Sequence, residues 1–98
     1  MLGERIPATE AVRLGLAYKM VPRASLDNEA ASLAARLAAG PTRAYGNTKK
    51  LLHASFNHSL GEQMDLEVAS FAECASNPDF AEGVKAFVER RKPQFRGE

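Results

Sequence analysis

Four cations crowd the C-terminal end of the sequence: Arg90, Arg91, Lys92 and Arg96. An arginine side chain presents a planar fork of N–H donors that can bind a phosphate through two hydrogen bonds. A local anion site is therefore one interpretation of this cluster. The other is a solvated helix end, because cations suit the negative end of a helix dipole. The residues alone leave both interpretations open.

The histidines and the cysteine do not indicate a metal site or a nucleophile. His53 and His58 have no Cys, Asp or Glu beside them at metal-ligand spacing, so we expect both at the surface. Cys74 is the only cysteine and has no base near it in its helical pattern, so we expect a small packed side chain. We predict no metal site and no catalytic residue in this sequence.

The acidic side chains have the spacing of a solvated helix face. A pair of catalytic carboxylates would need burial and shifted pKa values, and the pattern indicates neither. These residues are Glu62, Asp65, Glu67 and Glu73. The side chains thus describe a domain without a visible active site.

The composition is that of an ordinary globular protein, with 45% hydrophobic and 26% charged residues among 98. The net charge of +1 provides no field that would attract nucleic acid or a membrane. A lone cysteine is typical of a reducing compartment, so we expect a cytoplasmic protein. Because a short chain rich in alanine buries little apolar surface, we also expect it to need a partner.

Apolar residues recur at helical spacing and predict five helices. We expect these over residues 8–14, 26–39, 41–56, 60–75 and 78–92. Residues 16–21 are typical of an extended connector or a single edge strand, and no other stretch has strand character. The predicted fold class is all-α, with at most this one extended segment.

Capping signals mark two of the helix starts. Ser59 and Glu62 fit a capping box, in which each side chain satisfies a backbone N–H of the other residue. Asn77 offers a second cap, because Pro78 suits the first turn that follows it.

Glycine and proline mark the helix ends. Gly15 can adopt the positive φ of a helix terminator, and Pro93 is expected to end the last helix. Gly83 lies inside that helix, where glycine is unfavourable, so we expect it to permit the close approach of another segment.

Two longer stretches resemble one family. The first runs from Gly3 to Leu16 and reads GERIPATEAVRLGL, and the second runs from Asn77 to Phe95 and reads NPDFAEGVKAFVERRKPQF. Between them, residues 35–41 and Thr48-Lys49 match the same family's middle helices. In this order and at this separation, almost the whole chain resembles the C-terminal helices of the enoyl-CoA hydratase/isomerase (crotonase) family.

This resemblance implies a division of labour. In the family, an N-terminal spiral domain supplies the oxyanion-hole N–H groups and the carboxylates that move the proton. The C-terminal helices pack between subunits, in a trimer or a dimer of trimers, and cover part of the acyl-CoA site. We therefore expect residues 1–98 to be the oligomerising and site-covering domain, with the catalytic domain absent and the isolated chain inactive.

The resemblance also implies contacts with coenzyme A, which would be part of the substrate rather than a separate cofactor. The positions that match the family's CoA contacts are Phe71, Phe87, Arg90, Arg91 and Lys92. Aromatic rings supply stacking area, and the cations would face the nucleotide phosphates. For Phe71 and Phe87 the alternative is a place in the core, because both fall on apolar stripes.

The function that the resemblance implies is the C-terminal part of an enzyme that acts on acyl-CoA thioesters through an oxyanion-stabilised enolate. The alternative is a non-catalytic helical module whose function is subunit association. A nucleic-acid-binding helical domain is disfavoured, because the chain has no overall basic face.

Overall fold

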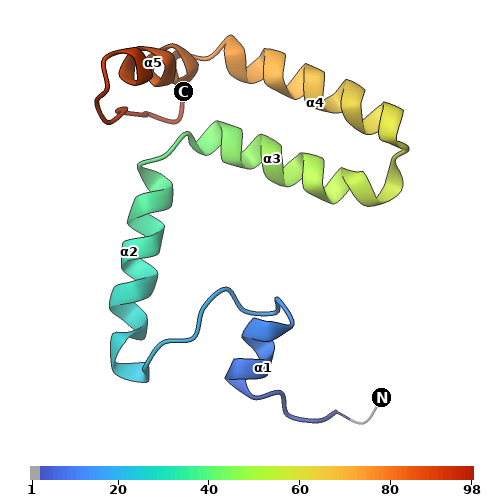
Figure 1. Cartoon of the computed structure of the whole chain (residues 1–98), viewed down its shortest axis with the longest axis vertical. Coiled ribbons are helices and arrows are strands. Elements are labelled where there is room, and N and C mark those ends of the chain that lie inside the picture. Colours follow the sequence, from blue (N-terminus) through green and yellow to red (C-terminus); the bar gives the residue numbers. More distant parts are fainter. Residues whose placement is uncertain (1–2) are drawn as a thin grey trace. The chain divides into compact units, whose positions relative to one another are not determined.

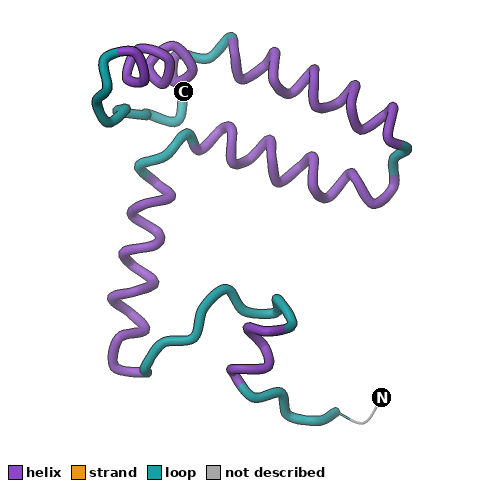
Figure 2. Tube along the Cα trace, in the orientation of Figure 1, coloured by secondary structure: helices purple, strands orange, loops and turns teal. Residues whose placement is uncertain are grey.

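The computed structural model describes residues 3–98, in which helices are joined by loops and no strand occurs (Figures 1 and 2). Its α-helices are α1 (Ala8–Arg13), α2 (Leu26–Ala38), α3 (Thr42–Ala54), α4 (Leu60–Ala75) and α5 (Pro78–Val88). Two 3₁₀ turns, η1 (Arg23–Ser25) and η2 (Ser55–Asn57), precede α2 and follow α3. The all-α prediction is confirmed. Residues 16–21 form a connector of bends and coil, not a strand.

The chain divides into two compact units, Met1–Leu33 and Ala34–Glu98, and the division falls within α2. In the first unit, Gly15 ends α1 with φ +73°. The Leu16 N–H donates to the Ala11 carbonyl at 2.8 Å, and the Gly15 N–H donates to the Val12 carbonyl at 3.1 Å. These two bonds are a Schellman motif, so the predicted terminator role of Gly15 is confirmed.

In the second unit, α3 and α4 form an antiparallel helical hairpin (Figure 1). The predicted capping box starts α4: the Ser59 N–H donates to Glu62 Oε2 at 2.8 Å, and the Glu62 N–H donates to Ser59 Oγ at 3.4 Å. Across the hairpin, Asn47 Nδ2 lies 3.5 Å from Cys74 Sγ. Cys74 is half-buried, as expected for a packed side chain.

The last helix is shorter than predicted. It ends at Val88, and the expectation that it continues to Pro93 is wrong. Arg90 adopts the left-handed conformation (φ 52°), and the Arg91 N–H donates to the Ala86 carbonyl at 3.0 Å. The chain therefore turns back at Arg90, and the helix has already ended before it reaches Pro93. At the other end, Asn77 occupies the N-cap position but its side chain makes no capping hydrogen bond.

The segment that follows this turn, residues 91–97, runs back along α5 and is called the C-terminal strap below. Its Phe95 ring lies over Gly83, where an added Cβ would be 3.5 Å from Phe95 Cε1. The predicted close approach of another segment at Gly83 is thereby confirmed.

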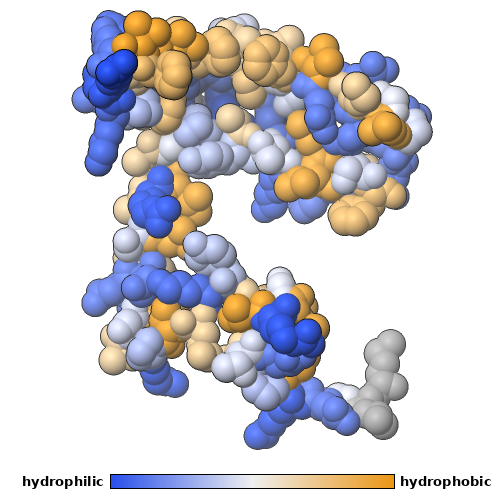
Figure 3. Space-filling view, in the orientation of Figure 1, coloured by the Kyte–Doolittle hydropathy of each residue, from blue (hydrophilic) through white to orange (hydrophobic). Residues whose placement is uncertain are grey.

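Few side chains are buried. Ala86 is the one fully buried hydrophobic residue in the part of the chain that the structure describes. Apolar side chains reach the surface over α4 and α5 (Figure 3). Helical spacing predicts that the apolar stripe of α5 faces inward, but its Val84, Phe87 and Val88 are exposed. Among these residues no helix is both long and apolar enough to cross a membrane.

Candidate functional site

The basic end of the chain begins at Arg90, directly after α5. Arg90 occupies the left-handed position of a second Schellman motif, in which its N–H donates to the Phe87 carbonyl at 3.2 Å. No ion pair or hydrogen bond engages its guanidinium within residues 3–98. The Arg90 side chain is exposed. Its donors are therefore available to an anion.

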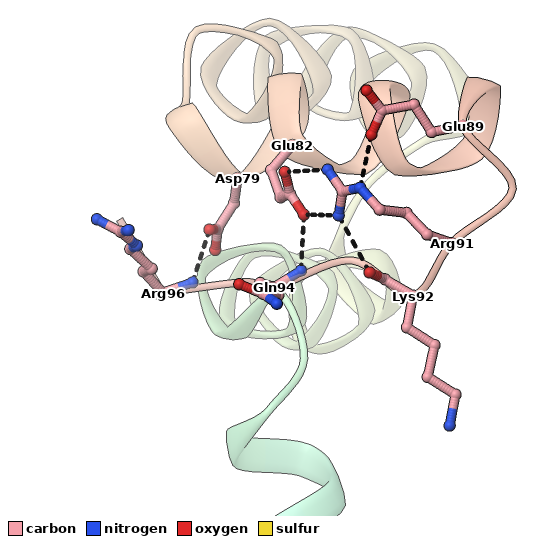
Figure 4. Close-up of polar contacts among 7 residues, drawn as sticks. All are labelled: Asp79, Glu82, Glu89, Arg91, Lys92, Gln94 and Arg96. Atoms are coloured by element: carbon pink, nitrogen blue, oxygen red, sulfur yellow. Dashed lines mark hydrogen bonds and ion pairs between the residues drawn. The ribbon is translucent and has the colours of Figure 1, made fainter.

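Arg91 is held by carboxylates of its own chain (Figure 4). Its Nη1 and Nη2 donate to the two oxygens of Glu82 at 2.6 and 2.9 Å, and its Nε donates to Glu89 at 2.6 Å. Its Nη1 also reaches the Lys92 carbonyl at 3.1 Å. The N–H donors of this guanidinium are thus occupied within the molecule. A contact between Arg91 and CoA stays a prediction, and such a contact would compete with these hydrogen bonds.

The same contacts shift the ionisation of both partners. The hydrogen bonds from Arg91, followed by the bond from the Gln94 N–H, lower the pKa of Glu82 to about 2. Glu82 and then Glu89 raise the pKa of Arg91 above its usual range. Both groups therefore stay charged over the whole range in which enzymes work.

The rest of the C-terminal strap is bound to α5 through backbone N–H groups. The Gln94 N–H donates to Glu82 at 2.8 Å. The Arg96 and Gly97 N–H groups donate to the two oxygens of Asp79 at 2.8 and 2.9 Å. Asp79 is only 7% exposed, so these bonds satisfy a buried carboxylate.

Asp79 and Glu82 are two carboxylates to which the sequence interpretation assigned no role. That interpretation considered only Glu62, Asp65, Glu67 and Glu73. The available signal was their spacing, because Asp79, Glu82 and Gly83 share one face of α5 and the glycine indicated that a segment crosses that face.

Lys92 and Arg96 are the other cations of the C-terminal cluster whose charged groups have no partner among the described residues. Figure 4 shows the Lys92 side chain extending away from the network around Glu82. Its carbonyl accepts from Arg91, but its ammonium has no carboxylate partner in the described part of the chain. Lys92 and Arg90 thus flank the anchored Arg91 on either side.

The two predicted aromatic contacts lie at different places. Phe71 on α4 meets Phe80 edge to face, with ring centroids 6.0 Å apart, and Phe71 is 65% exposed. Phe87 on α5 is 84% exposed. Neither ring is a core residue of this chain.

An apolar cavity of about 390 Å³ lies between the start of α3, α5 and the C-terminal strap. Phe87 lines it together with Phe80 and Phe95. Phe71 lines a separate cavity, of about 480 Å³, between α3 and α4. The structure therefore does not bring Phe71 and Phe87 into one cavity.

The described residues hold no group of three His, Cys, Asp or Glu side chains that could bind a metal. His53 and His58 are exposed, as expected. The described residues offer exposed cations that can bind an anion and exposed aromatic rings that can stack on a ligand.

Comparison with known proteins shows the family to which this chain is similar. The family model described as Enoyl-CoA hydratase/isomerase matches residues 1–98. A Rhodobacter capsulatus protein named "Probable enoyl-CoA hydratase" is 39% identical over 97 residues, which are 99% of this chain and 38% of that protein. The 1,2-epoxyphenylacetyl-CoA isomerase of Escherichia coli is 33% identical over 97 residues, covering 99% of this chain and 37% of the isomerase.

Solved structures agree with the sequence comparison. The crystal structure of an enoyl-CoA hydratase from a Polaromonas species is similar with a TM-score of 0.89 and 31% identity, over 96% of this chain and 37% of that one. The chain therefore spans less than two fifths of the length of the relatives it matches. Because the family match extends over every residue, the chain belongs to the enoyl-CoA hydratase/isomerase family.

Proposed function

We propose that this chain is the C-terminal part of an enzyme that acts on acyl-CoA thioesters through an oxyanion-stabilised enolate. The observation that carries the proposal is the family match along all 98 residues. Relatives named as an enoyl-CoA hydratase and as a CoA-ester isomerase fit it, because hydration and isomerisation of a thioester can share such an intermediate.

Within that enzyme, the role of this chain would be to bind the nucleotide end of the substrate. Arg90 and Lys92 would face the CoA phosphates, since both cations lack carboxylate partners among the described residues. Phe71 and Phe87 would supply aromatic area, and their exposure leaves both rings accessible. Arg91 would contribute positive charge while it remains bound to Glu82.

The catalytic groups would belong to the remainder of the enzyme. Two backbone N–H donors and one or two carboxylates outside this chain would stabilise the enolate and move the proton. The exposed apolar faces of α4 and α5 would pack in a homo-oligomer, a trimer or a dimer of trimers. A cytoplasmic role in fatty acid metabolism completes the proposal.

The second candidate is a non-catalytic helical module that only associates subunits. The exposed apolar side chains favour it as much as they favour the enzyme. The two candidates differ in the segment that would precede this chain, since only the enzyme requires an oxyanion-hole loop and a catalytic carboxylate there.

Turnover measurements test the proposal. The full-length enzyme should hydrate or isomerise a crotonyl-CoA-type substrate, whereas the purified 98-residue chain should not exceed a buffer blank. The physical reason is that the oxyanion-hole donors and the general base would lie outside this chain. Turnover by the chain alone, or a full-length protein that neither binds nor converts any acyl-CoA, would contradict it.

A further inference from the structure

Glu82 joins α5 to the start of the C-terminal strap. Its carboxylate accepts two hydrogen bonds from the Arg91 guanidinium, at 2.6 and 2.9 Å, and one from the Gln94 N–H at 2.8 Å (Figure 4). A bidentate arginine–carboxylate pair constrains both the distance and the orientation of its partners. Glu82 therefore sets the place of residues 91–94 relative to the helix.

Two of the three cations in the C-terminal cluster that lack a carboxylate partner among the described residues are the immediate neighbours of the residue that Glu82 holds. Arg90 precedes Arg91 and Lys92 follows it, so their Cα atoms lie about 3.8 Å from that of Arg91. The Arg91 guanidinium also donates to the Lys92 carbonyl at 3.1 Å, which ties the second neighbour to the same anchor. Holding Arg91 thus fixes the backbone from which both cationic side chains start.

The backbone of Arg90 needs this support. A positive φ is uncommon for a residue with a Cβ atom and persists only where surrounding contacts maintain it. Two backbone hydrogen bonds close the turn on the helix side, and the Arg91–Glu82 pair holds it on the strap side. The turn is what directs the chain back along α5 at the level of the two cations.

A second, separate anchor holds the far end of the strap. Asp79 accepts the N–H groups of Arg96 and Gly97 at 2.8 and 2.9 Å, one turn of α5 away from Glu82. This anchor contacts neither of the residues that flank Arg91. The strap therefore offers an internal comparison between the Glu82 anchor, which lies beside Arg90 and Lys92, and the Asp79 anchor, which holds the backbone of Arg96 instead.

We propose that Glu82 is a positioning residue for the substrate nucleotide: through Arg91 it holds Arg90 and Lys92 so that both cations bind the phosphates of one CoA molecule. The inference rests on the proposed function and adds to it a residue that does not itself touch the substrate. Phosphate binding then depends on an ion pair within the protein.

The test measures KM and kcat of the full-length enzyme with an acyl-CoA and with the matching acyl-pantetheine, which lacks the nucleotide phosphates. Glu82→Gln should raise KM for the acyl-CoA roughly threefold to tenfold, less than removal of the cations themselves. It should leave kcat and the acyl-pantetheine KM unchanged. In an Arg90→Ala/Lys92→Ala background, Glu82→Gln should raise KM no further.

Asp79→Asn is the matched control, because it removes the same charge from α5 but weakens only the far anchor. It should leave KM for the acyl-CoA within about twofold of the unsubstituted enzyme.

Hydrogen exchange reports directly on the two anchors, of which the near anchor is Glu82 and the far anchor is Asp79. The Gln94 amide should exchange faster in Glu82→Gln, and the amides of Arg96 and Gly97 should exchange faster in Asp79→Asn.

Three results would overturn the inference. One is an equal rise in KM for both substrates, which would mean that Glu82 only maintains the fold. Another is a rise that persists without Arg90 and Lys92. The third is an unchanged KM in Glu82→Gln while Arg90→Ala/Lys92→Ala weakens binding, an outcome that leaves the proposed function intact. If the double substitution itself has no effect on KM, the phosphate contact fails and the positioning role fails with it.

Discussion

Arg90 ends a helix with its backbone and presents an exposed side chain. Its backbone ends α5 in the left-handed conformation that glycine usually supplies, while its side chain projects from the turn without a partner in the described part of the chain. A glycine there would ease the backbone but could not bind an anion. The presence of an arginine fits a position where the side chain contributes to binding.

Arg90→Ala tests that contribution in the full-length enzyme. Losing a charge-assisted phosphate contact should weaken acyl-CoA binding by about 1–3 kcal/mol. The apparent KM should rise while kcat stays nearly constant, because the nucleotide is remote from the reacting carbonyl. Arg36→Ala, which removes an equal charge from α2, is the control. An unchanged KM for both acyl-CoA and acyl-pantetheine would leave Arg90 as a solvated helix end.

Glu82 should become protonated at a lower pH than an ordinary glutamate. Its pKa is lowered from 4.5 to about 2 in the folded chain, first by Arg91, then by the Gln94 N–H and more weakly by Lys85. A lowered pKa adds stability that is fully present above the unfolded-state value and is lost as the pH falls through the folded-state value. The near anchor should therefore weaken between about pH 4.5 and pH 2.

The Gln94 amide chemical shift, followed from pH 6 to pH 2, measures this transition. Its midpoint should lie nearer 2 than 4.5, and the transition should disappear in Glu82→Gln. A midpoint at the ordinary value would mean that Arg91 does not hold Glu82 in solution.

Among the elements, α5 is the one that organises the candidate site. One of its faces carries Asp79, Glu82 and Gly83, which together hold the C-terminal strap by two carboxylates and one close apolar contact. Its remaining surface carries apolar side chains that stay exposed. A short helix can serve both purposes because residues three and four positions apart share a face.

The limited space over Gly83 predicts that a small side chain there stabilises the protein and a large one destabilises it. A Cβ there would meet Phe95 at 3.5 Å, an ordinary contact distance. Gly83→Ala should thus raise the stability of α5 by up to about 1 kcal/mol, because alanine favours helix more than glycine. Gly83→Leu should instead displace the Phe95 ring and release the strap. Thermal melts followed by circular dichroism, with amide exchange of Gln94, distinguish the two; a destabilising Gly83→Ala would contradict the contact.

At the scale of the whole molecule, apolar exposure is the dominant feature. Val68 on α4 is 70% exposed and Phe87 on α5 is 84% exposed, and both lie on the apolar stripes of their helices. Stripes of this kind are stable in water only when another surface covers them.

The 98-residue chain should therefore self-associate. Sedimentation at micromolar concentrations should show species larger than a monomer, because association buries the apolar faces of α4 and α5. Val68→Asp should shift the distribution toward monomer, whereas Lys49→Asp, on an exposed polar position of α3, should not. A well-folded monomer up to high micromolar concentration would contradict this prediction.

Secondary structure was readable from the sequence because its signals are local. The capping box joins Ser59 and Glu62 across three residues, and Gly15 ends α1 through bonds to the preceding turn. Such interactions depend on residue type and spacing alone. The helical fold class and most helix bounds therefore followed from the pattern, and so did the close approach at Gly83.

The strap and its anchors could not be read in the same way. Arg91 and Glu82 are nine residues apart, and Asp79 and Gly97 are eighteen apart, so their bonds exist only because the chain turns back at Arg90. Arginine has no preference for the left-handed conformation, and its local pattern favoured a helix that continued to Pro93. That reversal is why Arg91 is paired with Glu82 while Arg90 and Lys92 have no carboxylate partner among the described residues. A long-range contact of this kind is decided by the packed chain rather than by residue spacing.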